Sequence, residues 1–218
     1  MKLTLFDLDH TLLAGDSDVL WCDFLIARGV LDQSFVRRNL DVAARYKAGV
    51  VDAAEFAAFY ISTLAGRSPR QWDNTRREFL ETEIVPRIPP AALELVQRHG
   101  NAGDLVVLTT ATNRFIVELT AIHLGITHLI ATEPELADGI FTGHATGVLN
   151  MREGKPVRLR AWLAGRGERL EAFHSTGYSD SINDLPLLEA VNTPVVVHAD
   201  ARLAAIAAQR GWRSIVLN

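Results

Sequence analysis

The sequence predicts an α/β fold: a parallel sheet with helices on both of its faces and an inserted helical cap domain. Three observations lead to this prediction. A short apolar run near the N-terminus is typical of a buried strand, a long helical stretch follows it, and the second half of the chain alternates strand and helix patterns. We expect residues 1–15 and 86–218 to form the core and residues 16–85 to form the cap.

The first half of the chain is expected to hold one strand and then only helices. Leu3–Leu8 is the short apolar run that predicts a buried strand. The pattern from about 17 to 84 is helical throughout. The segment DAAE at 52–55 is a capping-box pattern, and Ser68 followed by Pro69 predicts another helix start. The cap is expected to end at a group of prolines: Pro86, Pro89 and Pro90.

The second half of the chain alternates between strand and helix patterns, which favours a parallel sheet. The expected strands cover residues 105–108, 129–131, 172–178, 194–197 and 212–217. The expected helices cover residues 113–124, 155–163, 183–190 and 201–210, and the first of them is closed by Gly125. Three regularly spaced glycines predict a hairpin over residues 139–149.

The composition is typical of a folded globular protein and excludes several classes of function. The chain has 218 residues, 48% of them hydrophobic and 22% charged, so it can bury enough apolar surface to offset its ordering entropy. Lys and Arg number 22 against 26 Asp and Glu, which excludes the basic excess that binding to duplex nucleic acid needs. Cys22 is the one cysteine; it cannot form an internal disulfide, and we expect it in the core.

The sequence gives no indication of a membrane or exported protein. No segment approaches the roughly 20 apolar residues of a membrane span. Asp7 and Asp9 interrupt the N-terminal apolar stretch, where a signal peptide would need an unbroken apolar region. We therefore expect a cytoplasmic protein that does not bind membranes. The sequence carries no signal for an oligomeric state.

Polar side chains follow three of the predicted strands, at the edge where parallel strands end. In such sheets ligands bind beyond the carboxyl ends of the strands. The groups are Asp7 and Asp9 after the first strand, Thr109 and Thr110 after the second, and Ser179, Asp180 and Asp184 after a later one, with Lys155 opening a helix between them.

Carboxylates that converge on one sheet edge repel one another unless a cation lies between them. Hard oxygen ligands with few neutral partners suit Mg²⁺, which keeps several of its waters. Asp180 and Asp184 are four residues apart, so they share one face at a helix start. Each of these residues alone is more often a turn, cap or surface residue. Their combination in this order indicates a metal-assisted site.

The segment DLDHTL at residues 7–12 resembles the D-x-D-x-T-[LV] signature of the haloacid dehalogenase superfamily of phosphatases. Thr110, Lys155 and the segment at 177–184 resemble the second, third and fourth motifs, in the family's order. A cap directly after the first motif is similar to that of the helical-cap members, which include phosphoserine phosphatases and histidinol-phosphate phosphatases. The resemblance implies a Rossmann-like core.

The resemblance also implies a role for each matching residue. Asp7 would be the nucleophile that forms an aspartyl-phosphate, a known form of covalent catalysis by carboxylates. Asp9 would protonate the leaving alkoxide and then activate water, because a neighbouring carboxylate and partial burial raise its pKa. Members that act on carbon–halogen bonds lack this second Asp, so Asp9 favours phosphoryl transfer. Thr110 would bind a phosphoryl oxygen, and Lys155 would neutralise charge on phosphate and nucleophile.

The resemblance implies Mg²⁺ as the cofactor. Asp7, the backbone carbonyl of Asp9 and Asp180 would hold the ion, with Asp184 orienting bound waters and Asn183 supporting the site. The ion would shield the nucleophile from the negative charge of the phosphate and stabilise the transferring group.

Three points in the sequence leave alternatives open. Thr110 is followed by Ala111 and Thr112, where phosphoserine phosphatases usually have two glycines, which weakens that assignment. The phosphate ligand is either Thr109 or Thr110, and we favour Thr110. Asp16 is either the N-cap of the first cap helix or a binder of a substrate amino group, and we favour the N-cap.

The sequence therefore predicts a Mg²⁺-dependent phosphomonoester hydrolase that acts on a small phosphorylated metabolite through an aspartyl-phosphate. A phosphotransferase or mutase on the same core is one alternative, differing in the acceptor that attacks the intermediate. A non-enzymatic phosphorylatable switch is the other, although such domains need no general acid two residues after the phosphorylated aspartate. The expected partner is a small phosphomonoester, with no nucleic acid and no membrane.

Overall fold

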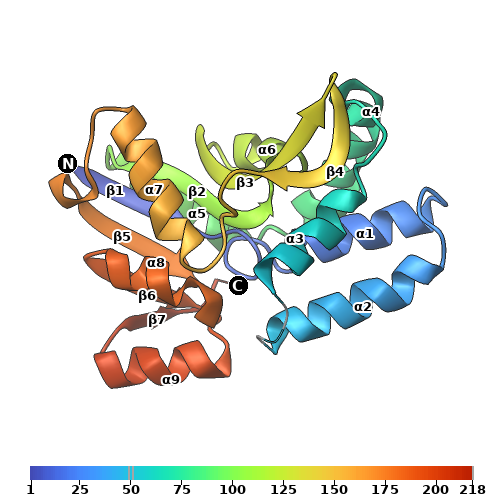
Figure 1. Ribbon diagram of the computed structural model, residues 1–218. Helices are drawn as coiled ribbons and strands as arrows, with labels where there is room; N and C mark the ends of the chain where they lie inside the picture. The colour runs from blue at the N-terminus through green and yellow to red at the C-terminus, as the bar shows by residue number, and fades with distance from the viewer. Residues whose placement is uncertain (49, 51, 218) are drawn as a thin grey trace.

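The computed structural model describes residues 1–48, 50 and 52–217. In this part of the chain a seven-stranded sheet has the order β4-β3-β2-β1-β5-β6-β7, and every neighbouring pair is parallel except β3 and β4 (Figure 1). The strands are β1 (Lys2–Phe6), β2 (Leu105–Asn113), β3 (His128–Ala137), β4 (Ile140–Thr146), β5 (His174–Ser179), β6 (Thr193–Val197) and β7 (Arg213–Ile215).

Helices fill the connections between these strands. The first four, all between β1 and β2, are α1 (Ser17–Ala27), α2 (Ser34–Lys47), α3 (Ala53–Ser62) and α4 (Pro69–Phe79). A π-helical turn (Leu80–Ile84) and a 3₁₀ turn (Val85–Arg87) follow α4. The later helices are α5 (Pro90–Asn101), α6 (Arg114–His123), α7 (Gly154–Gly165), α8 (Leu185–Ala190) and α9 (Ala201–Arg210), with 3₁₀ turns at Leu170–Ala172 and Ile182–Asp184.

The two faces of the sheet bury different helices, because side chains alternate along each strand. Leu3 and Leu5 of β1 pack with α7 and α8, whereas Phe6 packs in the cluster that contains α5 and α6. Leu203 of α9 packs with Val196 of β6 and with α8. Helices therefore cover both faces of the sheet, and the predicted α/β fold is confirmed.

Helices α1 to α4, here called the insert, lie to one side of the sheet in Figure 1. Trp21 of α1 and Trp72 of α4 belong to the same buried cluster as Phe6 of β1, so the insert shares a core with the sheet. A second cluster between α1, α2 and α3 includes Cys22, which is buried as expected, and Tyr60. The domain division at residues 15/16 and 85/86 stays a prediction.

The β3–β4 hairpin reaches over to the insert and bonds to it (Figure 1). The Gly66 amide donates to the Phe141 carbonyl at 2.9 Å, and the Phe141 amide donates to the Arg67 carbonyl at 3.0 Å. Gly143 has a φ of +88°, and a Cβ there would lie 3.0 Å from the side chain of Ala65. Only glycine combines this backbone conformation with so close an approach.

The structure corrects the prediction of a hairpin over residues 139–149. The turn lies at residues 138–139, and the first arm is β3, which is much longer than the strand expected at 129–131. Asp138 and Gly139 both have positive φ, the conformation that a tight hairpin turn requires. The glycine spacing had indicated a hairpin but not which segments pair.

Helix α5 was not predicted at all. Two prolines, Pro89 and Pro90, were interpreted only as a boundary, but Pro90 takes the first helical position, where its missing N–H costs nothing. Ala92, Leu95 and Val96 then form its buried face. No helix of the described residues is long and apolar enough to cross a membrane.

Helix starts follow their predicted signals with one exception. Ser68 and Gln71 form a complete capping box at α4, with Pro69 at the first position. At α3 the Asp52 side chain accepts from the Ala54 amide, but Glu55 does not reach back to the cap; it pairs with Arg45 at 2.6 Å instead. Several strand and helix bounds also move. Strand β2 continues to 113, well past its expected end at 108, so Thr109 and Thr110 lie within it; β5 starts at 174, α8 starts at 185, and β7 covers only 213–215.

Candidate active site

Strand β1 lies at the centre of the sheet, because later strands are added outward from it on both sides. Ligands bind at such a switch point, beyond the carboxyl ends of the strands. Asp7 follows β1, Asp180 follows β5, and Thr110 lies in the last part of β2. A cavity of about 890 Å³ lies there, lined by residues of both the core and the insert.

Asp7 is held on one side by a buried lysine. Lys155, in the first turn of α7, donates from Nζ to Asp7 Oδ1 at 2.7 Å and to Asp184 Oδ2 at 2.6 Å. Ser179 Oγ donates to the same Asp184 oxygen at 2.7 Å. Lys155, Ser179 and both carboxylates are buried, so these charge-assisted bonds fix their mutual positions. Asp184 thus holds Lys155 together with Asp7, and its role in orienting metal-bound waters stays a prediction.

The other oxygen of Asp7 faces Asp180. Thr11 Oγ1 lies 3.2 Å from Asp7 Oδ2 and 3.3 Å from Asp180 Oδ1, so one hydroxyl lies between two carboxylate oxygens. Thr11 belongs to the first motif, but the sequence suggested no contact for it. Its position shows that the Asp7 and Asp180 oxygens lie on the same side of the cavity.

Asp9 has a different set of partners. Its Oδ1 accepts from the backbone N–H of Ser17 at 2.7 Å, and its Oδ2 accepts from Thr112 Oγ1 at 2.9 Å. Thr110 Oγ1 lies 3.4 Å from the same Oδ2. Ser17 is the first residue of α1, so the positive end of that helix dipole also lies at Asp9.

Burial raises the pKa of the carboxyl groups gathered here, including those of Asp16 and Asp18, because the charged form loses its hydration. The pKa of Asp9 rises to about 6, with Asp16 adding repulsion. The pKa of Asp7 rises to about 7 even though Lys155 opposes the shift. Burial and the charges of Asp7 and Asp184 together raise the pKa of Asp180 to about 9. The cavity floor therefore holds more negative charge than Lys155 compensates.

This excess of carboxylate charge fits a divalent cation. No three His, Cys, Asp or Glu side chains among the described residues come together as a ready metal site. The predicted ligand set needs only two carboxylates, those of Asp7 and Asp180, together with the Asp9 carbonyl and waters. Hard oxygen donors of this kind suit Mg²⁺, and here they belong to carboxyl groups whose pKa is raised by burial and by repulsion from neighbouring carboxylates.

Thr109 and Thr110 point to different surroundings, as neighbours on a strand do. Thr110 Oγ1 lies beside Asp9 and accepts from the Thr112 amide at 3.2 Å. Thr109 Oγ1 instead accepts from the side-chain amide of Asn150 at 3.0 Å. Thr110 therefore lies beside Asp9 and Thr109 does not, although Ala111 and Thr112 of the same strand, and not Thr110, line the cavity. The assignment of Thr110 as the phosphate ligand stays a prediction.

The family of haloacid dehalogenase-like hydrolases matches residues 4–189. The chain belongs to this family. A histidinol-phosphatase from Neisseria meningitidis is 40% identical to the hydrolase over 214 residues, which cover 97% of this chain and 96% of the relative. A phosphoserine phosphatase from Mycobacterium tuberculosis is 35% identical over 95% of this chain and 68% of its own length. With these relatives the chain is a phosphatase of the family, as the motifs indicated.

Solved structures support the same placement. A protein of unknown function from Bordetella pertussis is 44% identical to the hydrolase, with a TM-score of 0.95 over 100% of this chain and 99% of its own. A substrate-bound phosphoserine phosphatase has a TM-score of 0.69 at 19% identity, which shows a common fold. The family is one whose members typically depend on a metal ion.

Asp16 satisfies the N-cap prediction for this hydrolase. Its Oδ1 accepts from the amides of Asp18 and Val19 at 3.0 Å each, and the same carboxyl group lines the cavity. The N-cap role therefore does not remove Asp16 from the substrate's reach. Asn183 also lines the cavity, and its Oδ1 accepts from Arg152 Nε at 3.2 Å.

Asn150 is a residue of the hydrolase that sequence reasoning missed. It is fully buried, and its Nδ2 donates to the carbonyls of Thr110 and Ile130, at 2.9 Å each, besides the Thr109 hydroxyl. The backbone N–H of Asn150 donates to Thr132 Oγ1 at 3.1 Å. Asn150 thus ties the segment before Lys155 to β2 and β3. An isolated asparagine in a loop gives no sequence signal for such a role.

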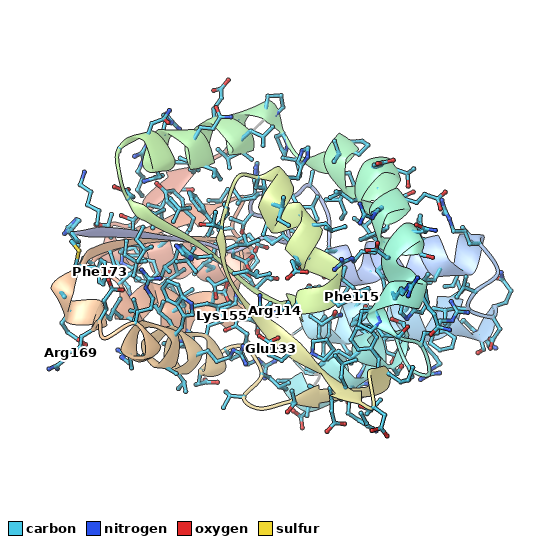
Figure 2. The ribbon with its side chains drawn as sticks, turned by 90° about the horizontal axis from the view of Figure 1, so that it is seen from above. Arg114, Phe115, Glu133, Lys155, Arg169 and Phe173 are labelled. Atoms are coloured by element: carbon cyan, nitrogen blue, oxygen red, sulfur yellow. The ribbon has the colours of Figure 1, made fainter. Side chains whose placement is uncertain are left out.

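A group of charged residues fixes α7, the helix of Lys155, to the sheet. Glu133 of β3 accepts from Arg114 Nε at 2.9 Å and from Arg158 Nη2 at 3.0 Å, and Arg158 lies one turn after Lys155. Figure 2 shows Arg114 and Glu133 together beside Lys155. Besides the bonds of Lys155 itself, α7 is therefore held to β3 through Arg158, which limits the positions that Lys155 Nζ can take.

Proposed function

We propose that this hydrolase cleaves the phosphate monoester of a small phosphorylated metabolite, with Mg²⁺, through an aspartyl-phosphate on Asp7. One observation carries the proposal: two carboxylates two residues apart have opposite surroundings. Asp7 contacts Lys155, whereas Asp9 contacts only uncharged donors from β2 and α1. Without metal, burial raises the pKa of Asp7 to about 7 and that of Asp9 to about 6. Lys155 opposes the shift at Asp7, and bound Mg²⁺ would favour the ionised form of Asp7 further, whereas the buried carboxyl group of Asp9 keeps the raised pKa that lets it carry a proton.

The two carboxylates then have different roles in the reaction. Asp7 Oδ2 attacks phosphorus, forming the aspartyl-phosphate as the bond to the leaving oxygen breaks, and Asp9 gives its proton to that oxygen. In the second step Asp9 takes a proton from water as the water attacks phosphorus, which restores Asp7 and releases phosphate. Lys155 and Thr110 stabilise the phosphoryl oxygens in both steps.

Asp7, Asp180 and the carbonyl of Asp9 would hold Mg²⁺, with Asn183 supporting the site. When bound, the ion supplies positive charge between the nucleophile and the phosphate, which lowers their repulsion. Asp184 contributes by holding Lys155 at 2.6 Å, and so keeps that charge on Asp7.

The part of the cavity wall that belongs to the insert indicates which class of leaving group the cavity can accept. Its described lining residues are apolar except for one carboxylate: Val19, Leu20, Ala43 and Phe56, with Asp16. Such a wall suits a leaving group with an apolar or aromatic part and an amine. Among the described residues, Arg202, a cation that could meet a carboxylate, lines the cavity from the core and not from the insert. We therefore propose an amino-bearing phosphate such as histidinol phosphate, in agreement with the Neisseria relative, rather than phosphoserine.

The experiment is a comparison of kcat/KM for histidinol phosphate, phosphoserine and a neutral alkyl phosphate, with Mg²⁺ and with EDTA. We expect multiple turnovers with Mg²⁺, the highest kcat/KM for histidinol phosphate, and no activity in EDTA. The Asp7→Asn variant is the control for contaminating phosphatase. A single burst of phosphate would instead indicate a phosphorylatable switch, and transfer to an added alcohol in place of water would indicate a phosphotransferase. Full activity in EDTA would contradict the metal assignment.

A further inference from the structure

Thr112 occupies the second position after Thr110, where the phosphoserine phosphatase pattern has a glycine. It is buried, with 1% of its surface exposed, and its hydroxyl donates to Asp9 Oδ2 at 2.9 Å. A glycine has no side chain with which to make this bond. The departure from the family pattern therefore places a hydrogen-bond donor on the carboxylate that serves as acid and base in the proposed function.

The Thr112 hydroxyl is itself held from the insert. Ser17 Oγ, also fully buried, donates to Thr112 Oγ1 at 3.0 Å. The backbone N–H of the same Ser17 donates to Asp9 Oδ1 at 2.7 Å. Hydrogen bonds in such a chain polarise one another, so each of them strengthens the next.

These contacts close a ring of three residues from three parts of the chain. Asp9 comes from the loop after β1, Ser17 from the first turn of α1, and Thr112 from β2. Ser17 and Thr112 lie 95 residues apart in sequence. Two of the three bonds end on the two different oxygens of Asp9, which leaves its carboxyl group little freedom to rotate.

We propose that Thr112 is a positioning residue for Asp9, and that through Ser17 it couples the orientation of this acid to the first helix of the insert. The inference rests on the proposed role of Asp9. Thr112 does not touch the nucleophile; among the described residues, Asp7 bonds with Lys155 and Thr11. Losing Thr112 should therefore affect proton transfer to the leaving group and not the attack of Asp7.

The test compares Thr112→Val with Thr112→Ser on two substrates. Valine keeps the shape of threonine and removes the donor, whereas serine keeps the donor. We expect Thr112→Val to lower kcat/KM about tenfold for an alkyl phosphate, a loss typical of one hydrogen bond to a charged group. It should leave kcat/KM for p-nitrophenyl phosphate nearly unchanged, since kcat/KM reports formation of the aspartyl-phosphate and that leaving group needs no acid. Thr112→Ser should retain most of the activity on both.

A matched control separates positioning from general destabilisation. Thr120→Val makes the same change at another buried threonine, in α6, and should leave the ratio of the two kcat/KM values unchanged. A Thr112→Val variant that loses activity equally on alkyl and aryl phosphates would contradict the proposal, because a merely structural defect affects both.

The second measurement repeats Thr112→Val in an Asp9→Asn background. If Thr112 acts through Asp9, the second change should cost less than about twofold there, because interacting residues are not additive. Equal losses in both backgrounds would overturn the proposal. The outcome is distinct from failure of the proposed function, since in that case Asp9→Asn alone would show no dependence on the leaving group.

Discussion

Asp7 and Asp9 are separated by one residue, yet they are held by different regions of the molecule. The partners of Asp7 come from the core: Lys155 on α7, and Thr11 in the loop after β1. The partners of Asp9 come from β2 and from the first helix of the insert, through Thr112 and Ser17. One carboxylate is thus fixed independently of the insert, and the other is fixed partly by it.

This difference indicates how one core can serve many substrates. A nucleophile that depends only on the core keeps its geometry when the insert changes. An acid that depends on the insert can be adjusted together with the wall that contacts the leaving group, because both belong to the same helix, α1. We expect changes in the insert to alter leaving-group dependence and KM before they alter phosphoryl transfer itself.

Asp7→Asn should have the largest effect, because it removes the proposed nucleophile. An amide does not attack phosphorus, so kcat should fall by several orders of magnitude on every substrate, whatever its leaving group. Folding should be preserved, because one of several clustered carboxylates is removed. The check is steady-state kinetics with circular dichroism; retention of more than about a tenth of the activity would remove Asp7 from its role.

Asp9→Asn should have the next largest effect, and its dependence on the leaving group should distinguish the role of Asp9 from that of Asp7. Loss of a general acid and base costs roughly 10²–10⁴-fold in kcat. The loss should shrink for p-nitrophenyl phosphate in the first step, because p-nitrophenolate leaves without a proton. Measuring kcat/KM, which reports this first step, over a series of leaving groups tests this. An equal loss for alkyl and aryl phosphates would argue against Asp9 as the acid.

Asp16→Asn should have a smaller effect, limited to one class of substrate. Asparagine is as good an N-cap as aspartate, so α1 should remain stable while the charge is lost. If Asp16 binds an amine, KM should rise roughly tenfold for histidinol phosphate and stay unchanged for a neutral alkyl phosphate. KM values that move together, or do not move, would leave Asp16 with the N-cap role alone.

The smallest effect concerns stability. Without metal, the pKa values of Asp9, Asp7 and Asp180 rise in the folded state to about 6, 7 and 9, so folding favours their protonated forms. That contribution is complete below the ordinary aspartate pKa and is lost as pH rises through the raised values. The free energy of unfolding in EDTA should therefore fall between about pH 5 and pH 9.

Added Mg²⁺ should flatten this slope, because it stabilises the ionised carboxylates. Denaturant unfolding at several pH values, with EDTA and with Mg²⁺, makes the comparison. Asp180→Asn should remove the upper part of the slope and Asp9→Asn the lower part. A slope that Mg²⁺ does not alter would contradict a metal held by Asp7 and Asp180.

The sequence predicted the parts of the molecule that depend on local signals. Strand ends with carboxylates, and the capping residues Asp16 and Ser68, follow from patterns a few residues long. The ring of Ser17, Thr112 and Asp9 could not be predicted, because it joins positions 8 to 103 residues apart that carry no mutual signal. Asn150 was missed for the same reason: its importance lies in which backbone carbonyls happen to surround it.

The secondary structure, too, was predicted correctly where a local sequence signal exists and was missed where none does. Helices with a polar cap residue were found, but α5 begins at Pro89 and Pro90 with no side-chain cap, so its start looked like a boundary. Strand β3 was predicted too short, because its second half pairs with β4 and is less apolar than the part within the parallel sheet.

The bonds between β4 and the insert cover one edge of the sheet. An open sheet has two edges, each with free N–H and C=O groups that can pair with another copy. Here one edge, β7, is only three residues long, and at the other both backbone groups of Phe141 in β4 are taken by Gly66 and Arg67. A chain from which α1 to α4 had been removed would still contain all seven strands, but β4 would lose this cover and become a template for aggregation.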